Sequence, residues 1–393
     1  MIILEKVNQA KKILKEFDVD CWITFVRETS IQHDPALDFL IQGHVTWHSA
    51  FIISSSGKTK AIVGQYDKQS IEDLKAYDDV EAFVEGIKKP LTNYLKELNP
   101  AKIGINFSKG SEICDGITYG MYLTLFEYLE GLGMQDRLVS SEKIVSALRE
   151  RKTKTEIDYI KKAIKHTEQI FDRVSKFIKP GLTEIKIAKF MREEVKQSGL
   201  GFAWEEEWNP AVFTGPDTAG AHYMPTERKV EKGHVLNMDF GMKFKGYCSD
   251  MQRTFYILKD GEPHAPEEVM KGFNTIVKAI DESKKAMKPG IQAFEIDAIA
   301  RRIVTENGYA AFPHGLGHQV GRYAHDGTAL LGPKWEKYAQ KPFQLLEEGM
   351  VFTLEPRLTV PDYGVATIEE MVVVTKNGSE WLSHPQKEII LIK

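Results

Sequence analysis

The stretches VLNMDFGMKFKGYCSDMQRTFYI (235–257) and VFTLEPRLTVPDYGVATIEEMVVV (351–374) decide the fold and the chemistry of this chain. Each reads as two strands around a turn, because apolar and β-branched residues flank a short segment with glycine or proline. We expect the turns to be centred near Phe244 and at Asp362. Each stretch also carries one acid on each predicted strand, at nearly equal distances from the turn.

Residues equidistant from a hairpin turn face each other, with about 4.5–5.5 Å between their Cβ atoms. Asp239 is therefore predicted to face Asp250, and Glu355 to face Glu369. Two like charges placed opposite each other destabilise a hairpin, and acids inside apolar strands are costly unless they are paired or bind a ligand. A single acid beside a turn usually lies on the surface or caps the turn. Two such pairs instead favour two divalent cations, which would neutralise four carboxylates.

Histidines gather between these two stretches, in FPHGLGHQVGRYAHDG (312–327), which holds His314, His318 and His325. Glycines suit a loop in which the backbone approaches a ligand closely. One of these imidazoles would complete a five-ligand set, and the others would donate hydrogen bonds to a substrate. Oxygen-rich sites with one imidazole suit Mn, Co, Fe or Zn in hydrolysis. The other histidines are interpreted as surface or core residues, except His222, which lies in AGAHYMP.

An internal repeat supports the pairing of the two stretches. FIKPGLTEIKIAKFMREEVKQSG (177–199) and AMKPGIQAFEIDAIARRIVTENG (286–308) align without a gap. In each copy a helix stops at Lys-Pro-Gly, a second helix stops at a glycine, and a histidine segment and an acid-bearing hairpin follow. The helices are predicted at about 154–178, 183–197, 267–287 and 293–306. We infer an internal duplication, in which His222 occupies the histidine segment of the first copy.

The N-terminal third alternates between helix and strand, which predicts an α/β domain. Helices are expected at 6–17, 70–77 and 120–132, and strands at 21–26, 50–54, 60–64, 80–84 and 102–107. At 393 residues the chain is long enough for two domains, which we place at 1–140 and 141–393.

Composition excludes several classes of protein. The net charge of −4 gives no polyanion-binding face, and no nucleic-acid motif is present. The opening MIILEKVNQAKK lacks the apolar core of a signal peptide, and no apolar run reaches the length of a membrane span. The three cysteines are isolated, without a CxxC pair, so a reducing cytoplasmic setting is expected.

Five motifs give the chain a family resemblance. NMDFG, GYCSDMQRTF, HGLGHQVG, LEPRL and TIEEMV resemble, in this order, the ligand motifs of the pita-bread metallopeptidases. This family includes aminopeptidase P, prolidase, methionine aminopeptidase and the metal-free creatinase, and the resemblance covers about 150–393. The N-terminal third resembles the creatinase-type domain of the aminopeptidase P and prolidase branch, which methionine aminopeptidases lack. The implied fold is an α/β creatinase-like domain followed by an α+β pita-bread domain with an internal pseudo-two-fold duplication.

The resemblance implies a role for each motif residue. Asp239 and Asp250 would hold one metal, His318 and Glu355 the other, and Asp250 and Glu369 would bridge the two. Two divalent ions are implied, manganese first, with cobalt, zinc or iron as alternatives. A hydroxide bridging the metals would attack the scissile carbonyl, with Glu355 as the proton shuttle and His222 or His325 stabilising the oxyanion. The resemblance also implies that substrate contacts come from three histidines: His222, His314 and His325.

The expected activity is hydrolysis of Xaa-Pro bonds, by an Xaa-Pro aminopeptidase or a dipeptidase, with a homodimer as the assembly. One departure from the branch bears on proline selectivity, since its members usually carry an arginine two residues before the last ligand and this chain has Thr367. Two alternatives therefore stay open. One is a non-peptidase C–N hydrolase of a small amide or amidine, and the other is an inactive peptide-binding module.

Overall fold

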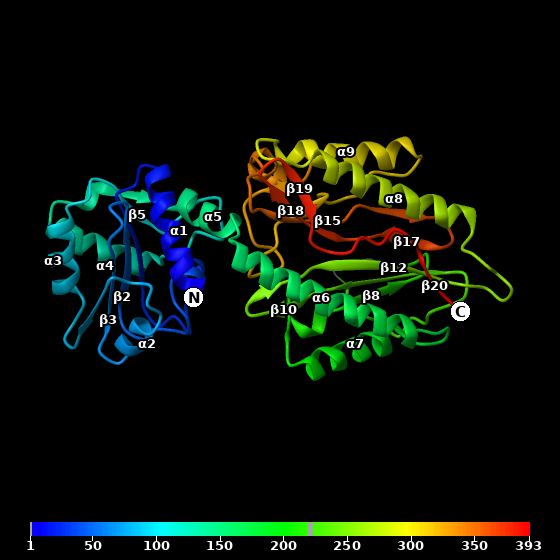
Figure 1. The fold of residues 1–393 in the computed structure, drawn as a ribbon, viewed down its shortest axis with the longest axis horizontal. Helices are drawn as coiled ribbons and strands as arrows, with labels where there is room; N and C mark the ends of the chain where they lie inside the picture. Colours follow the sequence, from blue (N-terminus) through cyan, green and yellow to red (C-terminus); the bar gives the residue numbers. More distant parts are fainter. Residues whose placement is uncertain (1, 219–222) are drawn as a thin grey trace. The chain divides into compact units, whose positions relative to one another are not determined.

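The computed structural model describes residues 2–218 and 223–393, which form two compact units (Figure 1). The N-terminal unit is Met1–Arg149 and the C-terminal unit is Glu150–Lys393. The boundary predicted at residue 140 lies just before α5 (Glu142–Glu150), and the units divide at the end of this helix. No helix in the described part of the chain has both the length and the apolar character that a bilayer crossing requires.

The N-terminal unit is built on a six-stranded sheet in the order β4-β3-β2-β1-β5-β6. The central strand β1 pairs antiparallel with β2 and parallel with β5, and the hairpin predicted from residues 50–64 is confirmed as β2 and β3. The strands are β1 (Cys21–Val26), β2 (Ser49–Ser54), β3 (Thr59–Gly64), β4 (Asp79–Phe83), β5 (Ile103–Ile105) and β6 (Leu138–Ser140).

Helices cover both faces of this sheet. Successive side chains of β1 point to opposite faces, and both sets are apolar and buried. Trp22 packs in one buried cluster with α1 (Ile2–Glu16) and α5. Ile23 packs in a second cluster with α3 (Lys88–Leu98) and α4 (Tyr119–Glu130). The short α2 (Lys68–Glu72) precedes β4. The predicted α/β domain is therefore a sheet between two helix layers.

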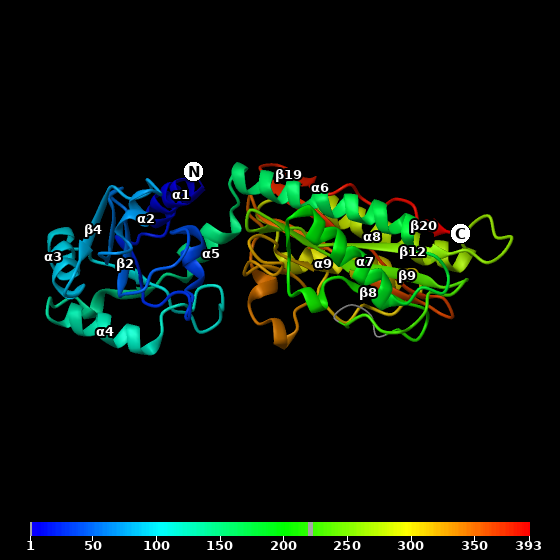
Figure 2. The same ribbon diagram turned by 90° about the horizontal axis from the view of Figure 1, so that it is seen from below.

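Two helix pairs frame the C-terminal unit. They are α6 (Lys154–Phe177) with α7 (Glu184–Ser198), and α8 (Glu267–Ala286) with α9 (Ala293–Glu306). All four lie where the repeat predicts them. In Figure 1 the strands of this unit lie between the two pairs, and Figure 2 shows the same elements from below. α6 packs on β10 and β11, α7 on β8, and α8 on β16 and β17.

The strands of the C-terminal unit form several small sheets. The largest has the order β20-β12-β9-β8, and others are β15-β18-β19, β16-β17, β11-β10-β7 and β13-β14. The bounds are β7 (Gly201–Phe202), β8 (Ala211–Thr214), β9 (Val235–Phe240), β10 (Met242–Phe244), β11 (Tyr247–Cys248), β12 (Met251–Ile257), β13 (Gly317–His318), β14 (Leu330–Leu331), β15 (Val351–Leu354), β16 (Arg357–Val360), β17 (Gly364–Thr367), β18 (Glu370–Thr375), β19 (Gly378–Trp381) and β20 (Ile390–Ile392).

The first acid-bearing hairpin differs from its prediction. Asp239 pairs with Gln252 in the β9–β12 ladder, and Phe244 pairs with Tyr247. The turn therefore lies at Lys245 and Gly246, which have φ angles of 48° and 82°. The predicted centre at Phe244 is wrong, and Asp239 does not face Asp250. The turn falls later in the sequence because Gly246 readily adopts the left-handed backbone conformation that such a turn requires.

The second hairpin follows its prediction. Arg357 pairs with Thr367, and Leu354 pairs with Glu370, so the two arms are centred on Asp362. The ladder is interrupted between these pairs, at Glu355 and Glu369. The interruption frees both acids from regular pairing within the hairpin.

Candidate metal centre

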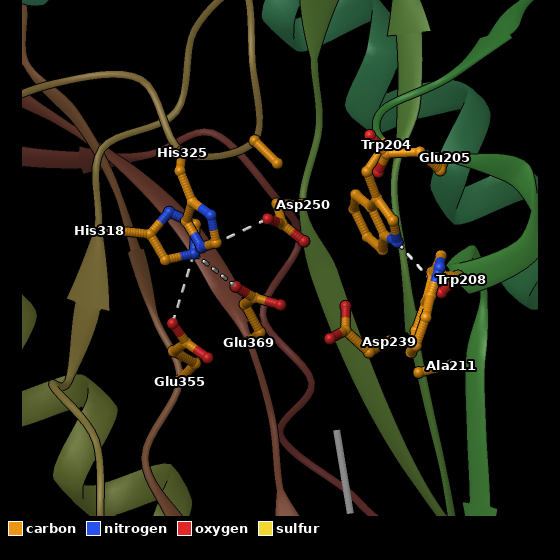
Figure 3. A pocket seen from close by; sticks show the side chains of 11 residues that line it. Trp204, Glu205, Trp208, Ala211, Asp239, Asp250, His318, His325, Glu355 and Glu369 are labelled. Atoms are coloured by element: carbon orange, nitrogen blue, oxygen red, sulfur yellow. Dashed lines mark hydrogen bonds and ion pairs between the residues drawn. The ribbon is translucent and has the colours of Figure 1, made fainter. Parts of the chain in front are cut away.

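The five predicted ligands come from five places in the C-terminal unit and meet at one point (Figure 3). Asp239 lies on β9 and Asp250 in the break between β11 and β12, while His318 ends β13. Glu355 follows β15 and Glu369 precedes β18. Figure 3 shows their carboxylates and the imidazole facing a common space, with Asp239 on the far side from His318.

His318 is close to three of the four acids. Its Nε2 atom lies 3.4 Å from Glu355 Oε1, 3.8 Å from Asp250 Oδ2 and 3.9 Å from Glu369 Oε1. Donor atoms of Asp250, His318 and Glu369 all lie within 4.8 Å of one another. The His318 Nδ1 atom is 3.3 Å from the carbonyl of Gln319. A ring that donates from Nδ1 to a carbonyl keeps its Nε2 lone pair for a metal.

A short backbone contact joins the two halves of the repeat at this site. Gln252 and Glu369 exchange hydrogen bonds, with N–O distances of 3.3 and 3.2 Å. Gln252 lies two residues after Asp250, so this bridge brings Glu369 of the second half next to Asp250 of the first. Neither hairpin alone contains the complete set of ligands.

Burial raises the pKa values of all four acids, and repulsion by neighbouring acids adds to this for three of them. Burial raises the pKa of Asp239 to about 7. Burial, followed by the negative charges of the neighbouring acids, holds the pKa values of Asp250, Glu355 and Glu369 well above their ordinary range. The guanidinium of Arg253 pairs with the carboxylate of Glu370, at 3.0 Å, and donates to the backbone carbonyl of Glu369, at 3.2 Å.

This donor set fits divalent cations. The Oδ1 atom of Asp239 is buried and has no hydrogen-bond partner among the described residues. Asp250 and Glu369 are buried and Asp239 and Glu355 are half-buried, so the four carboxylates together require positive charge. Carboxylates with one imidazole suit Mn, Fe, Co or Zn.

Glycine is required beside the imidazole ligand. A Cβ atom on Gly317 would lie 2.0 Å from the carbonyl oxygen of Thr353, so any side chain there would push β13 away from β15. The hydroxyl of Thr353 in turn accepts a hydrogen bond from the backbone of His318, at 3.2 Å. The glycines around His318 thus allow the close approach that the sequence predicted.

A first cavity of about 330 Å³ opens over the acids and extends past Asp239. Its outer wall contains Trp204, Glu205 and Trp208, which are not among the site residues predicted from the sequence. The indole Nε1 of Trp204 donates to the backbone carbonyl of Trp208, at 3.1 Å, which orients the Trp204 ring. The run WEEEW (204–208) marks this loop in the sequence, but nothing in it indicates that the loop folds beside the acids.

A second cavity of about 260 Å³ shares His318, His325 and Glu355 with the first. His314 lines its wall, and its Nδ1 atom lies 2.7 Å from the carbonyl of Gly315. The ring of His325 packs edge-on against His318, with 4.1 Å between the ring centroids. Both predicted substrate histidines therefore lie beside the metal centre. His222 lies outside the described residues.

Comparison with known proteins places the C-terminal unit in a sequence family. The profile of metallopeptidase family M24 matches residues 158–376. An uncharacterised peptidase of Staphylococcus aureus (strain USA300) is 33% identical over 244 residues, which are 62% of this chain and 65% of that protein. An uncharacterised peptidase of Staphylococcus haemolyticus is 33% identical over 247 residues, or 63% and 66%. The chain thus matches just under two thirds of the length of these relatives.

Solved structures match nearly the whole chain. An Xaa-Pro dipeptidase from Bacillus anthracis has a TM-score of 0.74 at 24% identity, over 99% of this chain and 100% of its own. An X-Pro aminopeptidase from Thermotoga maritima gives 0.75 at 22%, over 97% and 100%. A prolidase from Pyrococcus horikoshii gives 0.69 at 23%, over 98% and 100%. These matches confirm the predicted pita-bread fold with its N-terminal α/β domain.

Proposed function

Because the chain belongs to metallopeptidase family M24, we propose that it is a peptidase that hydrolyses Xaa-Pro bonds with two divalent metal ions. The observation that carries the proposal is the convergence of five metal-type donors from both halves of the repeat in the wall of the first cavity. The proposed ligands are Asp239, Asp250, His318, Glu355 and Glu369, and manganese is the proposed metal.

The metal pair, when bound, would supply an activated water nucleophile and polarise the scissile carbonyl. The remaining chemistry belongs to the protein. Glu355 borders both cavities, so its carboxylate can take a proton from the attacking water and give it to the nitrogen of the leaving residue. This nitrogen requires a proton from the enzyme, because it leaves as a free amine.

Histidines would bind the substrate around the scissile bond. His325 borders both cavities beside His318 and would donate a hydrogen bond to the carbonyl oxygen as negative charge develops there. His314, held by its contact with Gly315, would line the pocket for the leaving residue. We also assign substrate binding to His222, with a hydrogen bond to the scissile carbonyl oxygen. This assignment is based on its position in the order of motifs.

Proline after the scissile bond is the finer part of the proposal. Its ring fixes φ and removes the N–H donor, so it requires a dedicated pocket. The second cavity has Phe213, Leu330 and Tyr338 in its wall, which offer apolar surface to a proline ring. The solved structures with the same fold include proteins named for Xaa-Pro and prolidase activity, which supports this choice. A homodimer in the cytoplasm stays a prediction.

A substrate panel tests the proposal and its rivals together. The manganese-loaded protein would be assayed with Xaa-Pro dipeptides, longer Xaa-Pro peptides and small amides. We expect cleavage of Xaa-Pro peptides and none of the small amides. Cleavage of small amides alone would favour the non-peptidase C–N hydrolase that Thr367 leaves open. No cleavage together with no bindable metal would identify the inactive binding module.

A further inference from the structure

Arg357 is a half-buried arginine without an acidic partner in the wall of the second cavity. Within residues 2–218 and 223–393, its guanidinium makes no hydrogen bond or ion pair. Two other arginines of this unit with limited exposure are paired, since the buried Arg253 lies 3.0 Å from Glu370 and the half-buried Arg301 lies 2.9 Å from Asp297. A guanidinium removed from water without an anion is costly, so this one is suited to a ligand with negative charge.

Gln252 adds a second donor to the same wall. The side chain is only 4% exposed and lines the second cavity. Its Oε1 atom accepts a hydrogen bond from the hydroxyl of Thr367, at 2.7 Å. The Nε2 atom is therefore left as a buried donor, and it has no partner among the described residues.

Strand register brings these features together. Thr367 lies directly opposite Arg357 in the β16–β17 ladder. Thr367 on β17 thus holds the side-chain amide of Gln252, which belongs to β12. Arg357 occupies the position on β16 that faces Thr367. Two unsatisfied donors, one of them a cation, match an acceptor-only group, and a carboxylate has this character.

The position of Arg357 and Gln252 in the second cavity indicates which part of a bound peptide they would contact. The second cavity meets the first at His318, His325 and Glu355, where the scissile bond would lie. The opposite end of the first cavity carries Glu205 between two indoles, a surface that suits a substrate ammonium. A peptide placed this way directs its C-terminal side toward Arg357.

We propose that Arg357 and Gln252 form a carboxylate-binding subsite for the residue that follows the scissile bond. The carboxylate is the C-terminus of a dipeptide. An acidic side chain, on a residue that takes the place of proline, is the other source that the experiment separates. The subsite would make the protein select dipeptides, an inference that rests on the proposed peptidase function. Arg357 also borders a wider hollow formed by residues 308–313, so a longer peptide that extends past it is the competing outcome.

Matched acid and amide substrates test the subsite. The value of kcat/KM would be measured for Ala-Pro against Ala-Pro-amide and for Ala-Leu against Ala-Leu-amide, with manganese-loaded protein. We expect the wild type to prefer the free acids by at least about tenfold, and Arg357→Gln to remove this preference. Arg357→Lys should keep part of it, since the charge remains but the planar fork is lost. Arg302→Gln, at an exposed position on α9, is the matched control and should keep the wild-type ratio.

Two further substrates separate the sources of the carboxylate. A preference for Ala-Glu-amide over Ala-Leu-amide that disappears in Arg357→Gln would assign the subsite to an acidic side chain. A wild-type preference for Ala-Pro-Ala over Ala-Pro, or an acid-to-amide ratio that Arg357→Gln leaves unchanged, would overturn the proposal. Circular dichroism would confirm the fold of each variant, and Gln252→Leu provides the same comparison if Arg357→Gln does not fold.

Failure of the peptidase proposal would give a different pattern. If the loaded protein cleaves none of these substrates, calorimetric binding of Ala-Pro and Ala-Pro-amide still decides the subsite. At least about tenfold tighter binding of Ala-Pro, lost in Arg357→Gln, would support the carboxylate subsite without peptidase activity. Equal binding of the two compounds would overturn it.

Discussion

The acids of the metal centre depend on one another at the scale of single residues. Each is buried or half-buried beside others of the same charge, and loss of contact with water is the largest cause of every raised pKa. Asp250 has the central position, because it lies close to both His318 and Glu369. Loss of one carboxylate should therefore release the cations rather than weaken one contact.

Asp250→Asn tests this dependence. The amide keeps the volume of the side chain but removes its charge, so we expect loss of bound manganese and a fall in kcat/KM of more than about a hundredfold. Metal content by elemental analysis and hydrolysis of Ala-Pro are the two measurements. Asp260→Asn, at an exposed position outside the site, is the control. Full metal content and activity in Asp250→Asn would contradict the ligand assignment.

His325→Ala should separate substrate binding from metal binding. This histidine packs on a ligand but is not one of the five, so we expect manganese content to stay at the wild-type level. Loss of a hydrogen bond to the developing oxyanion should lower kcat by about a hundredfold. Unchanged kcat, or loss of metal, would show that His325 has another role.

The ligands could be predicted from the sequence because acids within apolar strands are rare unless they bind something. Residues such as Trp204 and Gln252 could not be assigned in this way. Their roles arise only when a loop or the facing hairpin folds against the metal centre. Arg357 was part of a quoted motif, but its missing acidic partner is visible only in three dimensions.

At the scale of elements, the centre depends on how closely short strands approach. The helices α6 to α9 and the second hairpin follow the sequence pattern, because long amphipathic periods and a Pro-Asp turn are strong local signals. The first hairpin was misplaced because equal spacing of Asp239 and Asp250 put its centre near Phe244, whereas its turn lies at Lys245 and Gly246. The helix α3 was not predicted, since only Leu91 and Leu95 mark its buried face.

Gly317→Ala tests the close approach of β13 and β15. The added Cβ would lie 2.0 Å from the Thr353 carbonyl oxygen and displace His318, so we expect weaker manganese binding. The strain should also destabilise the unit by about 1–3 kcal/mol. Calorimetric titration with manganese and urea denaturation measure the two effects. Gly378→Ala is the control, because a Cβ there meets nothing within 4 Å. Equal metal affinity in the two variants would contradict this account.

At the scale of the whole molecule, the chain combines two units with separate cores, and the N-terminal unit has a titratable group of its own. In the N-terminal unit the side chain of Asp34 is 2% exposed and is held by Ala36 and Asn106, through hydrogen bonds of 2.8–3.0 Å. Burial raises the pKa of Asp34 to about 6, although the charges of His33 and Arg149 act in the opposite direction. The folded unit therefore binds a proton at Asp34 more tightly than the unfolded chain.

This pKa predicts that the N-terminal unit loses stability as pH rises. For a raised carboxyl pKa the stabilisation is full below the ordinary value of 3.8 and is lost as pH rises through about 6. The shift corresponds to about 3 kcal/mol. As pH rises from 4 to 7, the free energy of unfolding should fall by about 3 kcal/mol less in Asp34→Asn than in the wild type. Urea titrations followed by hydrogen exchange in β1 measure it, with the exposed Asp136→Asn as control. Parallel pH profiles for wild type and Asp34→Asn would contradict the prediction.

The most direct test of the metallopeptidase proposal is a titration of metal-free protein with manganese, with the initial rate of Ala-Pro hydrolysis measured at each step. We expect no hydrolysis without metal, a rise on addition and a plateau at two manganese ions per chain. Hydrolysis that is unchanged by metal removal, or a loaded protein that cleaves no peptide, would contradict it.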